Sequence, residues 1–521
     1  MLSRRTLLAA LLAASSLATV SGPAAQAQDG GERLVITDAR GDYGLLAPYT
    51  HATNGPGYIY TSYIFDTLLD QDVEGSLVPG LARSWQVSDD HLVYDLTLDE
   101  AALWHDGTPV SAQDVAFTFA YMRDHPHAFV SLDALETVEA VADDRVSITL
   151  SRPDSSFPTN VLATMMVLPR HIYADQSTPV QFGDPVAATG SGPYRLVEYD
   201  RAQGRYLLES NPDYYRGAPR FDEVAIVRMT AEAAIQAMQA GEVDLISDLP
   251  YELVPQAEAA GISVLTVASN HPERLVFNHR GLFASRALRQ ALAYAIDRKE
   301  LADIAYPNAA LPASTGYFQP GSPWRSGEVP EDYTLDRDHA DRLFVEAGWE
   351  RDASGRWTRE GQPVELRLIT DSRYRRSATV LAEQLETYGF AVDLRLLEVA
   401  ALQQQAQADD FDLMLRPTST IGDPGAILSR VLGNSWTSDR FPDADGEMRG
   451  LIEAQAAATD PEERLKLLHR FEALYAEELP SLMLVNALWA TGHNDRVSPT
   501  FLPDGVASGI PMALHKSMFF R

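Results

Sequence analysis

Two strand–helix–strand units, far apart in the chain, constrain the fold more than any other sequence feature. Their strand, helix and strand ranges are 224–229, 231–240 and 243–246 in the first unit, and 364–369, 378–388 and 392–396 in the second. In both units the helix shows apolar residues at helical spacing and is followed by a glycine, Gly241 or Gly389, that is typical of a helix end. Such units build α/β domains. Two of them, about 140 residues apart, predict two α/β lobes.

The stretch before the first unit has a different pattern. Residues 92–98 and 145–150 alternate between apolar and polar side chains, which is typical of strands that face water on one side. Between these two strands lie a turn sequence at 105–109 and a helical pattern at 112–121. Ser111 is a suitable N-cap for this helix. This stretch therefore predicts a mixed α+β insertion.

The first 27 residues are typical of a secretory signal peptide. Arg4 and Arg5 precede an apolar run at 7–20 that is too short to span a bilayer, and A-Q-A at 25–27 is a small-residue cleavage site. The sequence S-R-R-T-L-L at 3–8 favours the twin-arginine route, with an ordinary secretory signal as the alternative. We expect an exported protein, located in a bacterial periplasm.

Charge and cysteine content exclude several kinds of function. The 521 residues carry a formal charge of −31, which disfavours nucleic acid and anionic membrane surfaces as partners. The chain has no cysteine, which excludes disulfides, thiolate metal sites and a cysteine nucleophile. The common motifs of serine hydrolases, zinc proteases, phosphate-binding loops and dinucleotide sites are also absent from the sequence. We therefore expect a protein that is not an enzyme and that holds no metal or cofactor.

Short motifs follow one another in order from about residue 33 to about residue 500. They are L-V-P-G-L-A-R-S-W (77–85), Y-D-L-T-L (94–98), H-D-G-T-P (105–109), G-S-G-P-Y (190–194), N-P-D-Y-Y (211–215), G-E-V-D (241–244) and R-A-L-R-Q-A-L-A-Y-A-I-D (286–297). Together they resemble the signature of the family 5 extracellular solute-binding proteins. These are the periplasmic receptors of dipeptide, oligopeptide and nickel ABC importers.

The resemblance implies a type II periplasmic binding protein, with two α/β lobes joined by a hinge and an extra α+β domain. It implies that the chain crosses between the lobes near residues 280–285 and 488–492. The implied domains are a signal peptide (1–27), lobe 1 (28–72, 190–283 and 490–521), the extra domain (73–189) and lobe 2 (284–489).

The implied function is to capture a peptide-like or other small polar solute between the lobes and to deliver it to an inner-membrane permease. An oligosaccharide, an opine, a nickel chelate and haem are alternative ligands within the family. A receptor that signals to a chemoreceptor and a periplasmic hydrolase are alternatives of other classes. We expect a monomer.

In the peptide receptors of this family, an aspartate in a loop of lobe 2 binds the free amino group of the peptide. The matching residue here is Thr420, which cannot neutralise an ammonium group. Arg416 and Asp423 are the alternative charged partners, and the Arg416 guanidinium suits a carboxylate or phosphate. Asp423 also precedes a proline, which is typical of a helix cap. Trp436 either stacks on ligand or packs in the core.

On lobe 1, the loop around residues 49–56 is implied to run along the ligand cleft. His51, Thr53 and Asn54 offer neutral donors and acceptors there, although Asn54 and Gly55 also fit an ordinary turn. Asn278 resembles a family position beside the hinge. The sequence thus predicts eight ligand-binding residues, which are His51, Thr53, Asn54, Asn278, Arg416, Thr420, Asp423 and Trp436.

Overall fold

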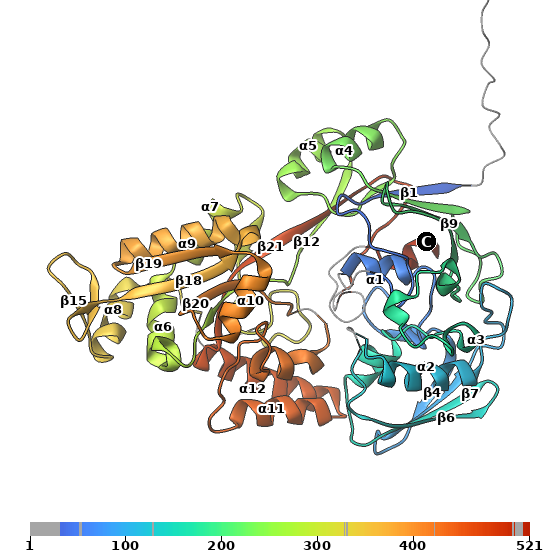
Figure 1. Ribbon diagram of the computed structural model, residues 1–521, viewed down its shortest axis with the longest axis horizontal. Coiled ribbons are helices and arrows are strands. Elements are labelled where there is room, and N and C mark those ends of the chain that lie inside the picture. The colour runs from blue at the N-terminus through green and yellow to red at the C-terminus, as the bar shows by residue number, and fades with distance from the viewer. Residues whose placement is uncertain are drawn as a thin grey trace, which may run out of the picture.

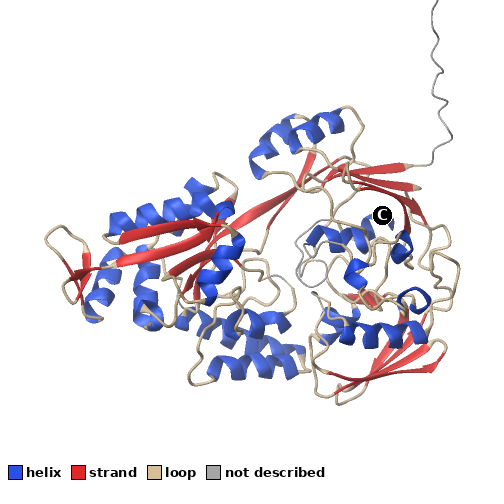
Figure 2. Ribbon diagram, in the orientation of Figure 1, coloured by secondary structure: helices blue, strands red, loops and turns tan. Residues whose placement is uncertain are grey.

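The computed structural model describes residues 32–51, 55–127, 130–327, 329, 332–420, 422–502, 505 and 514–520. The predicted signal segment lies outside this range. The described chain forms two lobes that are joined by long strands, and an additional small sheet lies below one of them (Figures 1 and 2). The predicted fold class, two α/β lobes with an extra α+β domain, is confirmed.

Lobe 1 is built around the first predicted unit. Strands β10 and β11, the two strands of that unit, both pair in parallel with the N-terminal strand β1. Helix α4 connects them, and Thr230 caps it by accepting the Ala233 N–H. The elements of this lobe are β1 (Arg33–Thr37), β8 (Tyr194–Asp200), β9 (Arg205–Ser210), β10 (Glu223–Val227), β11 (Leu245–Ile246), β12 (Ser263–Ala268), α1 (Gly55–Thr61), α4 (Ala231–Gln239) and α5 (Val254–Ala259).

The extra domain contains a four-stranded antiparallel sheet in the order β4-β5-β7-β6, with helix α2 packed against it. The predicted cap of α2 is confirmed, because Ser111 and Asp114 form a reciprocal capping box. The elements are β2 (Leu69–Gln71), β3 (Leu77–Pro79), β4 (Ala82–Val87), β5 (Val93–Leu98), β6 (Leu135–Ala142), β7 (Arg145–Leu150), α2 (Ala112–Asp124) and α3 (Arg170–Tyr173).

Two glycines join the extra domain to lobe 1 by close backbone approach. A Cβ atom at Gly190 would lie 1.9 Å from the Ile64 carbonyl oxygen, and one at Gly192 would lie 2.7 Å from the Tyr63 oxygen. His105 holds the same turn, since its Nδ1 accepts the Gly190 N–H at 3.2 Å and its Nε2 lies 3.0 Å from the Gly192 oxygen. The H-D-G-T-P and G-S-G-P-Y motifs are therefore structural partners.

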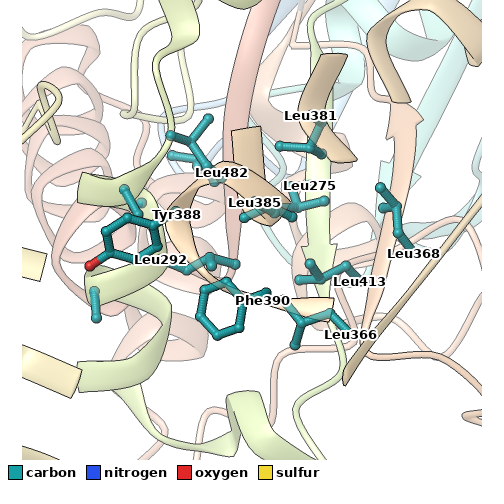
Figure 3. Packing of buried hydrophobic residues seen from close by; sticks show 14 of the residues in the cluster. Leu275, Leu292, Leu366, Leu368, Leu381, Leu385, Tyr388, Phe390, Leu413 and Leu482 are labelled. Atoms are coloured by element: carbon teal, nitrogen blue, oxygen red, sulfur yellow. The ribbon is translucent and has the colours of Figure 1, made fainter. Parts of the chain in front are cut away.

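Lobe 2 contains the second predicted unit, β18–α9–β19, whose strands pair in parallel. Leu381 and Leu385 of α9 lie against Leu366 and Leu368 of β18 in its core (Figure 3). The elements are β13 (Glu273–Phe277), β14 (Ala310–Pro312), β15 (Trp349–Arg351), β16 (Trp357–Arg359), β17 (Gln362–Pro363), β18 (Glu365–Asp371), β19 (Ala391–Leu397), β20 (Leu413–Pro417), α6 (Arg286–Ala295), α7 (Arg298–Ala305), α8 (Arg337–Glu346), α9 (Arg375–Tyr388), α10 (Val399–Gln407), α11 (Glu447–Ala457) and α12 (Pro461–Glu478).

One strand, β21 (Ser481–His493), belongs to both lobes. Its first residues pair with β13 and β14 of lobe 2, and residues from Leu488 onward pair with β12 of lobe 1. Strands β12 and β13 are consecutive, so the chain first crosses between the lobes at residues 269–272. This is earlier than the expected crossing near 280–285. The reason is that β13 already pairs with β20 of lobe 2, and a strand pattern alone does not show which sheet a strand joins.

In the described part of the chain, no helix has both the length and the hydropathy needed to cross a membrane.

Candidate functional site

The carboxyl ends of parallel strands meet where the lobes adjoin, and ligands of α/β proteins bind at such ends. On lobe 1, Asp38 follows β1 and forms a two-pronged ion pair with Arg40, with both N–O distances 2.9 Å. Tyr60 donates a hydrogen bond to the same carboxylate. Asp248 follows β11 and lies 3.5 Å from Arg40 Nε. This face of lobe 1 therefore carries two carboxylates and one guanidinium.

On lobe 2, the corresponding strand ends carry two neutralised ion pairs. Asp371, the last residue of β18, binds Arg373 through two contacts of 2.9 and 2.8 Å. In the second pair, Arg274 and Asp439 are fully buried and lie 3.1 Å apart, and Arg274 also donates to the Thr437 carbonyl. Burial raises the pKa of Asp439, against the lowering influence of the Arg274 charge.

Two of the predicted residues, Arg416 and Trp436, form one unit beside these pairs. Arg416 lies near the end of β20, directly opposite Arg274 of β13. Its guanidinium carbon stands 4.4 Å from the centre of the Trp436 ring, and Nη1 donates to the Trp436 carbonyl at 3.2 Å. Burial, and then the charge of Arg274, lower the pKa of Arg416 to about 10. Both side chains are partly exposed.

Thr420 lies at the crossing segment. Its N–H donates to the Asn270 carbonyl at 3.0 Å, and its hydroxyl donates to the same oxygen at 3.2 Å. The side chain of Asn270 in turn accepts from Asn486 of β21, which accepts from Ser269. Thr420 is 2% exposed, so its contacts in this structure connect the loop after β20 to the strands that cross between the lobes.

A second contact between the lobes lies at the opposite end from the crossing strands, where α11 and α12 approach the extra domain (Figure 1). Asp423 accepts two hydrogen bonds from Arg464 of α12, at 2.8 and 2.9 Å. Arg464 also donates to Ser156 of the extra domain at 3.1 Å, and the Ser155 N–H donates to the Ala456 carbonyl at 2.8 Å. We call Asp423, Arg464, Ser155 and Ser156 the latch. Through it lobe 2 contacts the extra domain, which is joined to lobe 1, at the end away from the crossing strands.

Asp423 has a further contact inside its own loop. Its Oδ1 accepts the Gly425 N–H at 2.9 Å and caps the short turn Pro424–Ala426. The cap interpretation of this Asp-Pro sequence is therefore confirmed.

The other predicted residues lie elsewhere. His51 is buried in lobe 1, with Nδ1 2.9 Å from the Ala47 oxygen and its ring near those of Tyr58 and His127. The Asn278 amide donates to the Asp409 and Phe411 carbonyls, and its oxygen accepts the Arg280 N–H. Thr53 and Asn54 lie outside the described residues. Their ligand roles, like those of the other predicted residues, stay predictions.

Two titratable groups near the crossing segment have pKa values that burial shifts. The side chain of Asp248 on lobe 1 is 37% exposed, yet burial raises its pKa. His271 on the crossing segment is exposed to solvent, yet burial, and then the Arg430 charge, lower its pKa to about 4. Both groups lie beside the strand ends described above.

The sequence profile of the bacterial extracellular solute-binding proteins, family 5, matches residues 76–439. The chain belongs to this family. Oligopeptide-binding protein AppA of Bacillus subtilis is 27% identical over 404 residues, which cover 73% of this chain and 69% of AppA. Heme-binding protein A of Haemophilus influenzae is 26% identical over 449 residues, which cover 79% of each chain.

Solved structures agree with this family 5 assignment. The ABC transporter substrate-binding protein CtaP of Listeria monocytogenes superposes with a TM-score of 0.77 at 26% identity, over 93% of this chain and 99% of CtaP. NikA of Brucella suis, in complex with Fe(III)-EDTA, superposes with a TM-score of 0.79 at 20% identity, over 93% and 98%. The latter likeness concerns the fold. This family 5 protein is therefore a solute-binding protein.

A cavity of about 840 Å³ lies away from the strand ends, between α6, α11 and α12 of lobe 2. Its lining includes Arg286 and Arg289, which pair with Glu477 and Glu478. These charges neutralise one another, and the residues lie at neither of the two interlobe contacts. The strand ends, rather than this cavity, are therefore the candidate site.

Several residues of this candidate site were not predicted. Arg40, Asp248 and Arg274 lie at strand ends, and Asp248 could have been found because it follows the strand of the first predicted unit. Arg464 gave no sequence signal, since a charged residue within an amphipathic helix is normally solvent-exposed. Its partner Asp423 lies 41 positions earlier in the chain.

Replacing Asn278 by alanine is expected to lower the free energy of unfolding by about 1–3 kcal/mol, because the buried Phe411 carbonyl and the partly buried Asp409 carbonyl lose their donor. Urea unfolding measures this loss, with Asn434→Ala in an exposed loop as the control that leaves stability unchanged. Binding of the solute that copurifies with the protein should be unaltered in Asn278→Ala. Normal stability together with weakened binding would instead support the ligand role predicted for Asn278.

Proposed function

We propose that this protein is the receptor of an ABC importer and that it captures a peptide-like solute between its two lobes. It then presents the solute to a permease in the inner membrane. The protein acts as a monomer in the periplasm and carries out no covalent chemistry. The predicted signal segment supports export, and the names of AppA and of di/tripeptide-binding protein 2 of Pseudomonas aeruginosa support a peptide ligand.

The arrangement of the strand ends is the observation that carries this proposal. Polar side chains from both lobes, including Asp248 and Arg416, stand beside the same crossing segment. The lobes are connected there by the 269–272 segment and by β21. A bend in these few residues changes the separation of the lobes while each core keeps its packing, which is how a hinge closes on a ligand.

The permease contact rests on the same two-lobe geometry. Residues of the latch come from lobe 2 and from the extra domain, which is joined to lobe 1, so the surface around it exists as a continuous patch only while these two parts are in contact. A permease that recognises such a patch would distinguish loaded receptor from empty receptor.

Native mass spectrometry of protein isolated from the periplasm without denaturation tests the proposal. We expect a series of added masses that fit short peptides, and we expect the same protein to lose them after unfolding and refolding in clean buffer. A single added mass of haem, an opine, a sugar or a metal chelate would contradict the peptide assignment while leaving the receptor function intact. Conversion of a solute into products would contradict the receptor function itself.

A further inference from the structure

The charges at the strand ends of lobe 2 do not balance. Around Arg416 there are three guanidinium groups, those of Arg274, Arg373 and Arg416, and two carboxylates that bind arginine. A further carboxylate, that of Glu273 on β13, is buried and accepts from Tyr306 instead. Asp439 is bound by Arg274 and Asp371 is bound by Arg373. Arg416 has no carboxylate oxygen within 4 Å among the described residues. One positive charge at this place therefore lacks a partner within the protein.

The Arg416 guanidinium is held in a fixed position. The Trp436 ring lies against it at 4.4 Å, and the Trp436 carbonyl accepts from Nη1. The backbone of Arg416 is part of strand β20. Its Nε is buried without an acceptor in the described structure. Stacking on a ring uses the face of the guanidinium and leaves its edge, where the N–H groups point, to meet a planar acceptor.

The neighbouring loop adds positive charge and offers no available carboxylate. Arg430 donates to the Ser419 carbonyl at 2.6 Å and also has no carboxylate within 4 Å in the described part of the chain. Asp423, in the same loop, is bound by Arg464. Thr420 is neutral and its hydroxyl binds a backbone carbonyl. An ammonium group at this place would meet the cations Arg416 and Arg430, while Asp371, Asp423 and Asp439 are each already bound by another arginine.

Desolvation of Arg416 also favours the binding of an anion. A partly buried cation without a counter-ion is costly, as the lowered pKa of Arg416 also indicates. An incoming anion would supply the missing partner and would form charge-assisted hydrogen bonds with the edge of the guanidinium. The overall charge of the chain is −31, so the surroundings of Arg416 and Arg430 are a positively charged region in a negatively charged protein.

We propose that lobe 2 recognises its solute through a carboxylate group that binds Arg416, with Trp436 fixing the plane of the guanidinium. The solute is accordingly an anion, or a zwitterion whose carboxylate faces lobe 2. This inference rests on the proposed receptor function and specifies the chemistry of its ligand. For a peptide, the group recognised on this lobe is the C-terminal carboxylate and not the free amine.

Isothermal titration with trialanine, trialanine amide and N-acetyl-trialanine tests the inference. The wild-type protein is expected to bind the acid and the acetylated acid alike and the amide about 10- to 100-fold more weakly, the range of a charge-assisted hydrogen-bond pair. Arg416→Gln should lose the same factor for the acid and should no longer distinguish acid from amide. Arg416→Lys, which keeps the charge but not the fork of donors, should fall between them.

Arg395→Gln serves as the matched control, because Arg395 lies on β19 of the same lobe and is paired with Asp393. It removes the same charge and should bind all three peptides like the wild-type protein. Melting temperatures of the variants, measured without ligand, confirm that each is folded. Equal binding of acid and amide by the wild-type protein, or unchanged binding by Arg416→Gln, would overturn the carboxylate proposal. The proposed function as a peptide receptor would be unaffected by either result.

A wild-type protein that binds none of the three peptides would contradict the peptide assignment instead. The carboxylate proposal is then decided on the solute that copurifies from the periplasm and on a thermal-shift screen of carboxylic acids and their amides. We expect a carboxylate-bearing solute that Arg416→Gln loses and Arg395→Gln retains. A solute without a carboxylate, or a screen in which no carboxylic acid raises the melting temperature, would overturn it.

Discussion

Lowering the pH from 6.5 to 4 is expected to destabilise the protein steeply, because several of its histidines, His271 among them, have lowered pKa values in the folded state. Burial lowers the pKa of His51 to about 4 and that of His105 to about 4. Burial, and then the charge of Arg289, lower the pKa of His279 to about 3. The ordinary value in an unfolded chain is about 6.5.

The direction of the effect follows from proton binding. Between pH 6.5 and 4 the unfolded chain takes up protons at these histidines and the folded chain does not, so the free energy of unfolding falls as the pH falls. Each histidine contributes up to about 1.4 kcal/mol per pH unit in this window. Their contribution is fully present above pH 6.5. Glu273 and Glu472, whose pKa values burial raises, act in the opposite direction, so the slope of the wild-type protein is a net value.

A single substitution isolates the histidine effect. His105→Asn should reduce the slope of unfolding free energy against pH by up to about 1.4 kcal/mol per unit, because it removes a group that must accept the Gly190 N–H while neutral. His91→Asn is the matched control, since His91 has a positive φ of 54° that asparagine tolerates. Urea titrations at a series of pH values give both slopes. An unchanged slope in His105→Asn would show that this histidine is already protonated in the folded protein.

Replacing Arg464 by methionine is expected to lower the free energy of unfolding by about 3–5 kcal/mol and to separate the two lobes. The side chains of Arg464 and Asp423 are 7% and 3% exposed, so the substitution leaves a buried carboxylate without its partner. It also removes the hydrogen bond from Arg464 to Ser156 of the extra domain. Small-angle X-ray scattering should show a larger radius of gyration than for the wild-type protein.

A double variant separates these two effects. Asp423→Asn added to Arg464→Met removes the stranded charge and keeps a side-chain oxygen that can cap the Pro424–Ala426 turn. Most of the stability should return, whereas the lobes should remain apart because Arg464 no longer reaches Ser156. A single variant within about 1 kcal/mol of the wild-type protein, with the same radius of gyration, would show that the latch does not hold the lobes together.

Local periodicity was sufficient to predict the two strand–helix–strand units. The predicted helix at 378–388 lies within α9, and the predicted strands match β18 and β19 within about two residues. The Ser111 cap was predictable because capping depends on residues three positions apart. The partner of β13 was not predictable, since it depends on β20, about 140 residues later.

The candidate site was predicted less completely for the same reason. Arg416 was recognised as a possible anion partner. That it has no carboxylate partner in the protein depends on the pairing of Asp371 with Arg373 and of Asp439 with Arg274. Arg373 is a sequence neighbour of Asp371, whereas Arg274 lies 165 positions before Asp439. Charge balance at a site is a property of the whole fold, and composition gives only its sum over the chain.

Strand β21 also determines when the protein can fold. It supplies pairing partners to β11, β12, β13 and β14, and its lobe 1 partners precede it by about 220–250 residues. Until synthesis has passed residue 493, neither lobe has its shared strand, and the edges of β11 and β13 have no partner on that side. Unpaired edges of this kind favour aggregation, and contacts so distant in sequence form slowly. The two lobes therefore mature together, as one late and cooperative event, and the cell must keep the nascent chain from associating with other chains until then.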